Sequence, residues 1–461
     1  MMLDSIVILG GGFAGAATAI KLVEAGYPAG QVTIVEPRTE LGRGIAYSTS
    51  DLDHLVNGPA RMFSLYPDDP GHLSRWLANH PDRRGWAGPA DGSFDASFPP
   101  RCLYGDYVQS ELAKTGVQHV VDRAVDVLPE GEVLLASGRR LPATRIVLAT
   151  GLVRNESGFA ISDSVRSQAR YIGNPWAANA YDAIGGSEGD VAIVGSSLTM
   201  LDIVISLEKR GFRGRYFTFS RRGLLVQSRR EVEAWPAFLR LEKLPGTALA
   251  LLREIQRERR AIATGGEDWQ RLILSLRPFI EPLWANASDI ERRRFTRHLR
   301  TFWDMAFHRA VPDSMTWLDR VLKQGRFFNV AGRVQGLAPS AEPGVEVTWR
   351  RRGDPESQSR RFDHVVNAAG YEADWRRLPD ALPRNLLARG AVRPHPVGFG
   401  IEADAATGAV IGSDGHASRR LFAVGHPLRG AAWEASSVLE QIEGATRVAR
   451  AVSADRMRNA A

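Results

Sequence analysis

The sequence predicts an α/β fold with two glycine-loop βαβ units, the second inserted into the first. The apolar run Ile6–Leu9 leads into the glycine loop Gly10–Gly15, an Ala-rich helical stretch and a second apolar run that ends on Glu36. The run Val191–Val194 leads into Gly195 in the same way. The 461 residues leave room for two or three domains of ordinary size.

The first loop has the chemistry of a dinucleotide site. Its glycines let backbone N–H groups approach a pyrophosphate at a helix N-terminus, and an acid at the end of the second strand can accept hydrogen bonds from ribose hydroxyls. A glycine-rich turn without a ligand is the alternative interpretation. The residues predicted to bind a nucleotide here are Gly10, Gly12, Phe13, Ala14, Gly15 and Glu36.

The second unit differs from the first at one informative position. From Gly10 to Glu36 is 26 positions, and from Gly195 to Arg221 is also 26. A carboxylate repels the 2′-phosphate of NADPH, whereas arginines bind it through charge-assisted hydrogen bonds. A solvated turn is the alternative, and Met200 stands where a third glycine is expected. The predicted NADPH-binding residues are Gly195, Ser196, Ser197, Ser220, Arg221 and Arg222.

Apolar spacing predicts the remaining elements. Residues 37–100 are rich in Gly, Pro and Asp and are predicted to be mostly loop. Strands that end in small-residue turns are predicted at 145–151, 364–371 and 421–425. The other predicted strands are 132–135, 216–219, 327–334 and 345–349, and the predicted helices are 72–77, 107–113, 198–207, 249–262, 269–276, 295–307 and 435–452.

Composition and charge exclude several classes of function. Apolar residues make up 44% of the chain without any run of about 18, so no membrane span is predicted. The single cysteine, Cys102, excludes a dithiol redox pair and a cysteine-rich metal site, and no metal is predicted. The net charge of +7 comes from scattered arginines rather than a basic block, so nucleic acid is not an expected partner. With no export signal, we expect a cytoplasmic protein.

Taken together, the motifs resemble the two-dinucleotide-binding-domain flavoproteins, which include flavin monooxygenases, N-hydroxylating monooxygenases and pyridine-nucleotide reductases. The first loop with Glu36, the strand end 148–151, the second loop and residues 421–425 carry this resemblance across nearly the whole chain. A bacterial branch of FAD/NAD(P)-binding proteins is the most similar group. Its marks are residues 42–47, 54–57, 220–224 and 429–434.

The resemblance implies FAD at the first site and NADPH at the second. It implies an FAD-binding Rossmann-like domain from 1–175 and 351–461, interrupted by an NADPH-binding Rossmann-like domain at 176–350 with a helical insert at about 225–325. The last helix, starting near Trp433, is expected to point its N-terminus at the flavin. The further cofactor-binding residues implied are Gly44, Thr150, Gly151, Gly370, Gly425 and Trp433.

Three residues are candidates for the catalytic neighbourhood of the flavin. Asn57 and Arg61 could form a wall of the site, or be ordinary polar loop residues. His426 follows Gly425 where these flavoproteins usually have an aspartate, so it either replaces that contact or is a loop histidine. Residues 363–371 partly match the D-x-x-x-FATGY stretch of N-hydroxylating monooxygenases, or form an ordinary strand and turn.

Without a dithiol, a reduced flavin must pass its electrons to oxygen, a small molecule or a protein. The favoured interpretation is an FAD- and NADPH-dependent monooxygenase of a small molecule, with N-hydroxylation of an amine as one version. An NADPH-dependent reductase with a protein or quinone acceptor and a non-catalytic redox sensor are the alternatives. Arg297, Arg300 and His308 could bind an acidic substrate from one helical stripe, or form a solvated face. The sequence does not predict the oligomeric state.

Overall fold

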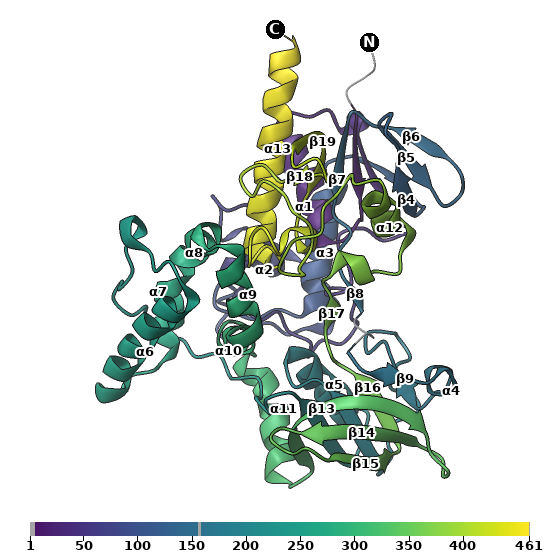
Figure 1. Ribbon diagram of the computed structural model, residues 1–461, viewed down its shortest axis with the longest axis vertical. Helices are drawn as coiled ribbons and strands as arrows, with labels where there is room; N and C mark the ends of the chain where they lie inside the picture. Colours follow the sequence, from purple (N-terminus) through teal and green to yellow (C-terminus); the bar gives the residue numbers. More distant parts are fainter. Residues whose placement is uncertain (1–4, 155–157, 461) are drawn as a thin grey trace.

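Two large sheets, each with a core of parallel strands, lie one above the other in Figure 1 and carry the two βαβ units. This computed structural model describes residues 5–154 and 158–460. The upper sheet has six strands in the order β18-β19-β7-β1-β2-β3, and only β18 runs antiparallel to its neighbour. Its strands are β1 (Ile6–Leu9), β2 (Val32–Val35), β3 (Gln118–Val120), β7 (Arg145–Leu148), β18 (Ala409–Ile411) and β19 (Ala417–Ala423).

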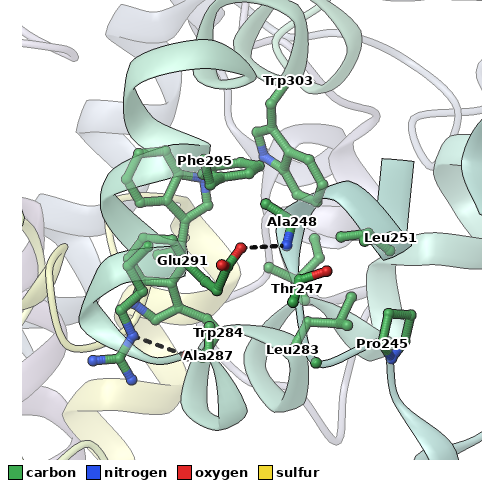
Figure 2. Close-up of a pocket in the computed structure, with 14 residues that line it drawn as sticks. Pro245, Thr247, Ala248, Leu251, Leu283, Trp284, Ala287, Glu291, Phe295 and Trp303 are labelled. Atoms are coloured by element: carbon green, nitrogen blue, oxygen red, sulfur yellow. Dashed lines mark hydrogen bonds between the residues drawn. The ribbon is translucent and has the colours of Figure 1, made fainter. Parts of the chain in front are cut away.

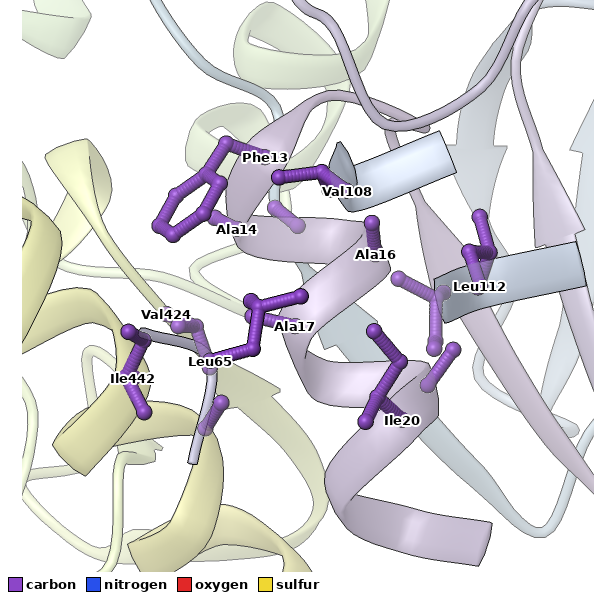
Figure 3. Close-up of a cluster of buried hydrophobic side chains, with 14 of the residues drawn as sticks. Phe13, Ala14, Ala16, Ala17, Ile20, Leu65, Val108, Leu112, Val424 and Ile442 are labelled. Atoms are coloured by element: carbon purple, nitrogen blue, oxygen red, sulfur yellow. The ribbon is translucent and has the colours of Figure 1, made fainter. Parts of the chain in front are cut away.

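Small residues on the first helix let three helices pack together against one face of this sheet. Ala16, Ala17 and Ala19 of α1 (Phe13–Glu24) are fully buried. Their short side chains let α3 (Arg101–Ala113) and α13 (Val438–Ala460) pack close to α1 (Figure 3). The helix α3 contains the predicted segment 107–113 but begins six residues earlier, at Arg101.

The lower sheet contains the second unit. Its main strands run in the order β10-β16-β11-β12-β13-β14-β15, with β9 beside β13. The strands are β9 (Ala160–Ile161), β10 (Tyr171–Ile172), β11 (Asp190–Val194), β12 (Arg215–Ser220), β13 (Phe327–Pro339), β14 (Val345–Arg351), β15 (Ser357–Phe362) and β16 (His364–Asn367). Because β9, β10, β15 and β16 lie outside residues 176–350, this sheet extends beyond the second domain's predicted boundaries, which stay a prediction.

The predicted helical insert lies beside α13 in Figure 1. It has a small apolar core of its own that includes Leu251, Ile262 and Leu272. The helix predicted at 295–307 is interrupted at Leu299. The insert helices are α6 (Ala248–Thr264), α7 (Gln270–Leu276), α8 (Ile280–Asn286), α9 (Asp289–His298) and α10 (Arg300–Phe307). The next helix, α11 (Pro312–Lys323), instead packs on α5 (Leu198–Lys209) of the second unit.

Smaller elements complete the fold. A short pair, β8 (Val153–Arg154) and β17 (Tyr371–Glu372), lies between the two large sheets (Figure 1). The predicted strand at 132–135 is the middle strand of a three-stranded antiparallel sheet, formed by β4 (Ala124–Val127), β5 (Glu132–Leu135) and β6 (Arg140–Pro142). The remaining helices are α2 (His72–Asn79), α4 (Asp163–Arg166) and α12 (Ala381–Ala388). Among the described residues, no helix has the length and apolar character needed to cross a membrane.

His54 connects the first unit to helix α5 of the second. Its Nε2 atom lies 3.0 Å from Ser206 Oγ and 3.2 Å from the carbonyl oxygen of Asp202. Burial is the main cause that lowers the pKa of His54, which favours the neutral ring. Arg101 also pairs with Asp202 at 2.8 Å. These buried contacts hold the two units in one relative position.

The last helix begins at Val438, so the expectation that its N-terminus lies near Trp433 is wrong. The preceding residues form tight turns instead. The N–H of Ala435 donates to Ala432 O at 3.0 Å, and the N–H of Ser437 donates to Glu434 O at 2.8 Å. These turns accompany the packing of Trp433 against the insert.

Candidate functional site

The first glycine loop is held against the edge of the upper sheet. Gly10 has φ +109° and donates its N–H to Val35 O at 2.9 Å. A Cβ on Gly10 would overlap the carbonyl oxygen of Ala149, and a Cβ on Gly15 would overlap that of Gly10. The loop therefore needs glycine at both positions, and α1 starts directly at the ends of the strands.

Glu36 is fixed beside this loop at the end of β2. Its carboxylate accepts hydrogen bonds of 2.8 Å from the Gly11 N–H and from Arg38 Nε. Burial raises the pKa of Glu36, but these hydrogen bonds outweigh it, so the pKa is lowered overall. The lowered pKa favours the ionised carboxylate, the form that accepts hydrogen bonds from ribose hydroxyls, and its contact with a nucleotide stays a prediction.

The other residues predicted for the first site converge on the same loop. Gly44, at φ +57°, packs on Gly12, which precedes α1 and provides no side-chain cap. Thr150 and Gly151 lie just beyond the end of β7, after Ala149, and Gly425 lies beyond β19 at φ +78° beside Ala14. The first N–H groups of α1 thus have no side-chain cap, as a helix N-terminus that binds phosphate requires.

The second loop repeats this geometry. Gly195 has φ +126° and donates its N–H to Phe219 O at 2.9 Å. A Cβ there would overlap the carbonyl oxygen of Ala368, at the end of β16. Ser197 precedes α5 without capping it through its side chain, and Gly370 lies just beyond β16 at φ +86°.

Arginines from three parts of the chain gather beside the second loop. Burial lowers the pKa of Arg221, and the neighbouring charges of Arg300, Arg222 and Arg333 lower it further. Arg222 donates to His298 O at 3.3 Å and lies 4.7 Å from the Phe302 ring centre. The sequence did not predict Arg333, and it suggested Arg300 for an acidic substrate rather than for this site, because only the tertiary fold brings both next to Arg221. The cluster forms an electropositive corner at the end of β12.

Ser196 and Ser220 have local structural roles in addition to any contact with a nucleotide. Ser196 Oγ donates to Leu224 O at 2.6 Å, and Ser220 Oγ accepts the Gly223 N–H at 3.1 Å. These bonds fix the segment that carries Arg221 and Arg222.

The three candidate catalytic residues occupy two places. Asn57 is exposed, and its carbonyl accepts a hydrogen bond from Arg229 at 3.4 Å. Arg61 lies 3.5 Å from Glu231 in an exposed ion pair. Burial, followed by the charge of Arg429, lowers the pKa of His426 to about 4, so its ring is neutral at pH 7. The catalytic roles of all three stay predictions.

Trp433 packs into an aromatic cluster formed with the insert. It is 2% exposed, and its ring centre lies 4.8 Å from that of Trp284 and 5.3 Å from that of Phe295. Trp284 Nε1 donates to Gly430 O at 2.7 Å, and Trp303 Nε1 donates to Glu434 at 2.8 Å. The segment 429–434 therefore anchors the insert, while a contact between Trp433 and a cofactor stays a prediction.

A small, mainly apolar hollow of about 50 Å³ adjoins this cluster. Figure 2 shows Trp284, Phe295 and Trp303 around it, with the Glu291 carboxylate accepting the Ala248 N–H at 2.8 Å. Cys102 lies apart from both loops, in the buried core of α3, where burial raises the pKa of its thiol. Within residues 5–154 and 158–460, no cluster of three His, Cys, Asp or Glu side chains is arranged to hold a metal ion.

Comparisons with known proteins agree with this geometry. A family model described as FAD-NAD(P)-binding matches residues 7–153. No curated protein sequence matches the chain. The ornithine N-hydroxylase of Kutzneria sp. 744 is 16% identical, with a TM-score of 0.65 over 98% of this chain and 99% of that one. The cadaverine monooxygenase of the desferrioxamine pathway from Erwinia amylovora is 14% identical, with a TM-score of 0.65 over 98% and 95%. Thioredoxin reductase from Lactococcus lactis is 10% identical, with a TM-score of 0.52 over 99% and 100%.

The chain therefore has the fold of the two-dinucleotide-binding-domain flavoproteins, as its motifs predicted, and residues 7–153 match an FAD-NAD(P)-binding family model. Within this class, it shares its fold with N-hydroxylating monooxygenases over nearly their whole length.

Proposed function

We propose that this protein is an FAD-dependent oxidoreductase that is reduced by NADPH and uses oxygen to hydroxylate a small molecule. One observation carries the proposal. The two βαβ units have matching glycine loops but opposite charges at the end of the second strand. Glu36 stands there in the first unit and Arg221 in the second. Two different nucleotides in one fold are the combination that a flavoenzyme needs.

The residues at the first loop fit FAD. The N-terminus of α1 has no side-chain cap, so its N–H groups are suited to the pyrophosphate, and Glu36 is ionised for the ribose. When bound, FAD supplies the two-electron redox chemistry that no side chain of this protein can perform. The protein's own contribution is to bind, orient and exclude water.

The residues at the second loop fit the 2′-phosphate of NADPH. Arg221 is surrounded by further arginines, and a bound dianion would relieve their mutual repulsion. NADH has no such phosphate, so the same corner gives it no comparable contact. This difference makes the choice of nucleotide a direct test.

Two observations support oxygen as the electron acceptor. The single cysteine cannot provide the dithiol of a disulfide reductase. The ornithine N-hydroxylase and the cadaverine monooxygenase reach higher TM-scores than the thioredoxin reductase. Amines are therefore the first compounds to test as substrates, and N-hydroxylation is the proposed reaction.

The first experiment compares nucleotides. In the purified, FAD-loaded protein we expect kcat/KM to be higher with NADPH than with NADH. Arg221→Ala should lower the NADPH value about 10- to 100-fold, the loss of about 1.5–3 kcal/mol from a charged hydrogen bond. NADH turnover should not change. Arg384→Ala, at an exposed position on α12, is the control. Equal use of both nucleotides by the unmodified protein would contradict NADPH, and a protein that takes up no FAD would contradict the whole proposal.

The second experiment follows the oxygen. Ornithine, lysine and cadaverine are added in turn while NADPH oxidation, oxygen uptake and hydroxylated product are measured together. A monooxygenase should oxidise NADPH slowly until its substrate is present and then form product. Reduction of a dye or quinone without hydroxylation of any added compound would favour the electron-transfer reductase.

A further inference from the structure

Four arginines from separate parts of the chain form a second positive cluster, away from Arg221. They are Arg61, Arg229, Arg277 and Arg309. After burial, the charges of Arg61 and Arg277 are the causes that lower the pKa of Arg229. Burial and the charge of Arg229 lower the pKa of Arg309 to about 10, with smaller contributions from Arg230 and Arg277. The four guanidinium groups therefore share one electrostatic environment.

Two of these arginines have no acidic partner. The contacts of Arg229 are the carbonyl oxygen of Asn57 at 3.4 Å and Met62 Sδ at 3.6 Å. Arg309 is 6% exposed and donates to Gln270 Oε1 at 2.6 Å, and its Nε has no hydrogen-bond partner among the described residues. In the part of the chain that the structure describes, neither has a carboxylate oxygen within 4.0 Å.

The acidic side chains near the cluster are either paired with another arginine or exposed to solvent. Arg61 lies 3.5 Å from Glu231, in a pair that is mostly exposed. Asp268, which raises the pKa of Arg309, is itself paired with Arg230. Arg277 donates to Glu440 Oε1 at 3.2 Å. Burial raises the pKa of Glu440, which favours its protonated form, and its Oε2 has no hydrogen-bond partner. The cluster thus has more positive charge than its neighbours balance.

One arginine of the cluster, Arg277, contacts the start of the last helix. Glu440, the partner of Arg277, is in the first turn of α13, and Gln441 follows it. Gln441 Oε1 lies 3.2 Å from the point that a Cβ on Gly425 would occupy, and Gly425 touches the start of α1 through Ala14. On its other side, the cluster contacts the Asn57 loop. A chain of contacts through α13 and Gly425 thus connects the cluster with the start of α1.

The helical stripe proposed from the sequence is a weaker candidate for binding an acid. Arg300 pairs with Asp304 at 3.2 Å, and His308 lies 4.0 Å from Glu434. Arg300 and His308 thus already lie within 4.0 Å of a carboxylate oxygen, whereas Arg229 and Arg309 have none at that distance among the described residues.

We propose that Arg229 and Arg309, assisted by Arg61 and Arg277, bind an oxyanion group of the substrate, a carboxylate or a phosphate. Guanidinium groups bind such oxyanions through paired N–H donors, and a bound anion removes the repulsion among them. The inference rests on the proposed function, because it assigns the substrate to the FAD side of the molecule.

The test measures binding rather than turnover. Inorganic phosphate and succinate are titrated separately into the full-length, FAD-loaded protein by calorimetry at constant ionic strength. We expect saturable binding of at least one probe, and we expect Arg229→Gln and Arg309→Gln each to weaken it about 10-fold or more. Arg384→Gln should leave it unchanged. Arg309→Lys, which keeps the charge, replaces Arg309→Gln if that variant does not fold.

A parallel titration with NADP⁺ separates this cluster from the corner at Arg221. Arg229→Gln should bind NADP⁺ like the unmodified protein, whereas Arg221→Ala should bind it about 10-fold more weakly or worse. Equal loss of phosphate and NADP⁺ binding in Arg229→Gln would overturn the proposal, as would the absence of saturable binding of either probe. Phosphate binding by a protein that takes up no FAD would support the anion site and overturn only the proposed function.

Discussion

The third fingerprint position of the first loop is Gly15, while the corresponding position of the second loop is Met200. A side chain at Gly15 would overlap the carbonyl oxygen of Gly10, so α1 lies directly on its strand. Met200 is fully buried among the apolar residues around α5 instead. One helix approaches its strand backbone to backbone, and the other is separated from it by a packed side chain.

The two loops nevertheless agree at their first position. Gly10 and Gly195 both have positive φ, and each lies against the end of a neighbouring parallel strand, at Ala149 and Ala368 respectively. Both units therefore need a glycine at the turn that would present N–H groups to a phosphate. The distance at which the following helix packs on its strand can differ between them. The end of the second strand then decides which nucleotide fits.

The largest expected effect tests the shared position. Gly10→Ala and Gly195→Ala should each lower the free energy of unfolding by about 4 kcal/mol, because both add backbone strain at positive φ and overlap with a carbonyl oxygen. Urea unfolding with separate probes for the two units measures it. Gly30→Ala is the control, since no atom lies within 4 Å of an added Cβ. A loss as small as that of Gly30→Ala would contradict the common geometry.

The next effect separates the two loops at the third position. Gly15→Ala should destabilise the first unit by about 3 kcal/mol through overpacking. Met200→Ala should destabilise the second by about 3 kcal/mol for the opposite reason, because it leaves a cavity. Met200→Leu conserves volume and should cost less than about 1.5 kcal/mol. Thermal unfolding of the three variants checks this order. If Met200→Ala were neutral, the second helix would not depend on its side chain for packing.

The smallest effect concerns Glu36 and is sensitive to pH. Its pKa in the folded protein lies below the ordinary value of 4.5, so the ionised carboxylate stabilises the fold at pH 7. Glu36→Gln should lower the free energy of unfolding by about 1.5 kcal/mol at pH 7. The difference from the unmodified protein should shrink as the pH falls below about 4.5. Urea unfolding at pH 7 and at pH 4 measures it, with the exposed Glu356→Gln as control. A difference that grows on acidification would show that the carboxylate is not the stabilising form.

Local patterns predicted both βαβ units. An apolar run, a glycine loop and a helical stretch are consecutive in sequence, so β1, α1 and β11 could be placed without knowing the rest of the fold. The start of the last helix could not. The residues from Trp433 onward have helical spacing, but the aromatic side chains of the insert hold Trp433 and the chain turns until Val438. The contact that overrides the helical spacing thus joins segments about 150 positions apart in the sequence.

The candidate sites divide in the same way. Glu36 and Arg221 could be identified by their distance from a glycine, because a βαβ unit has a nearly fixed length. The arginines that surround Arg221, and those that surround Arg229, come from loops and helices distant in sequence. In a chain with so many arginines, no spacing distinguishes these from solvated ones.

The sequence by itself determined the two dinucleotide loops and their opposite charges, because strand, turn and helix are local and follow from glycine, apolar and acidic positions. Only the tertiary structure decided where the insert lies, how His54 connects the two units and which arginines come together. Those features depend on contacts between segments that the chain order keeps far apart, and packing and electrostatics act only once the chain has folded.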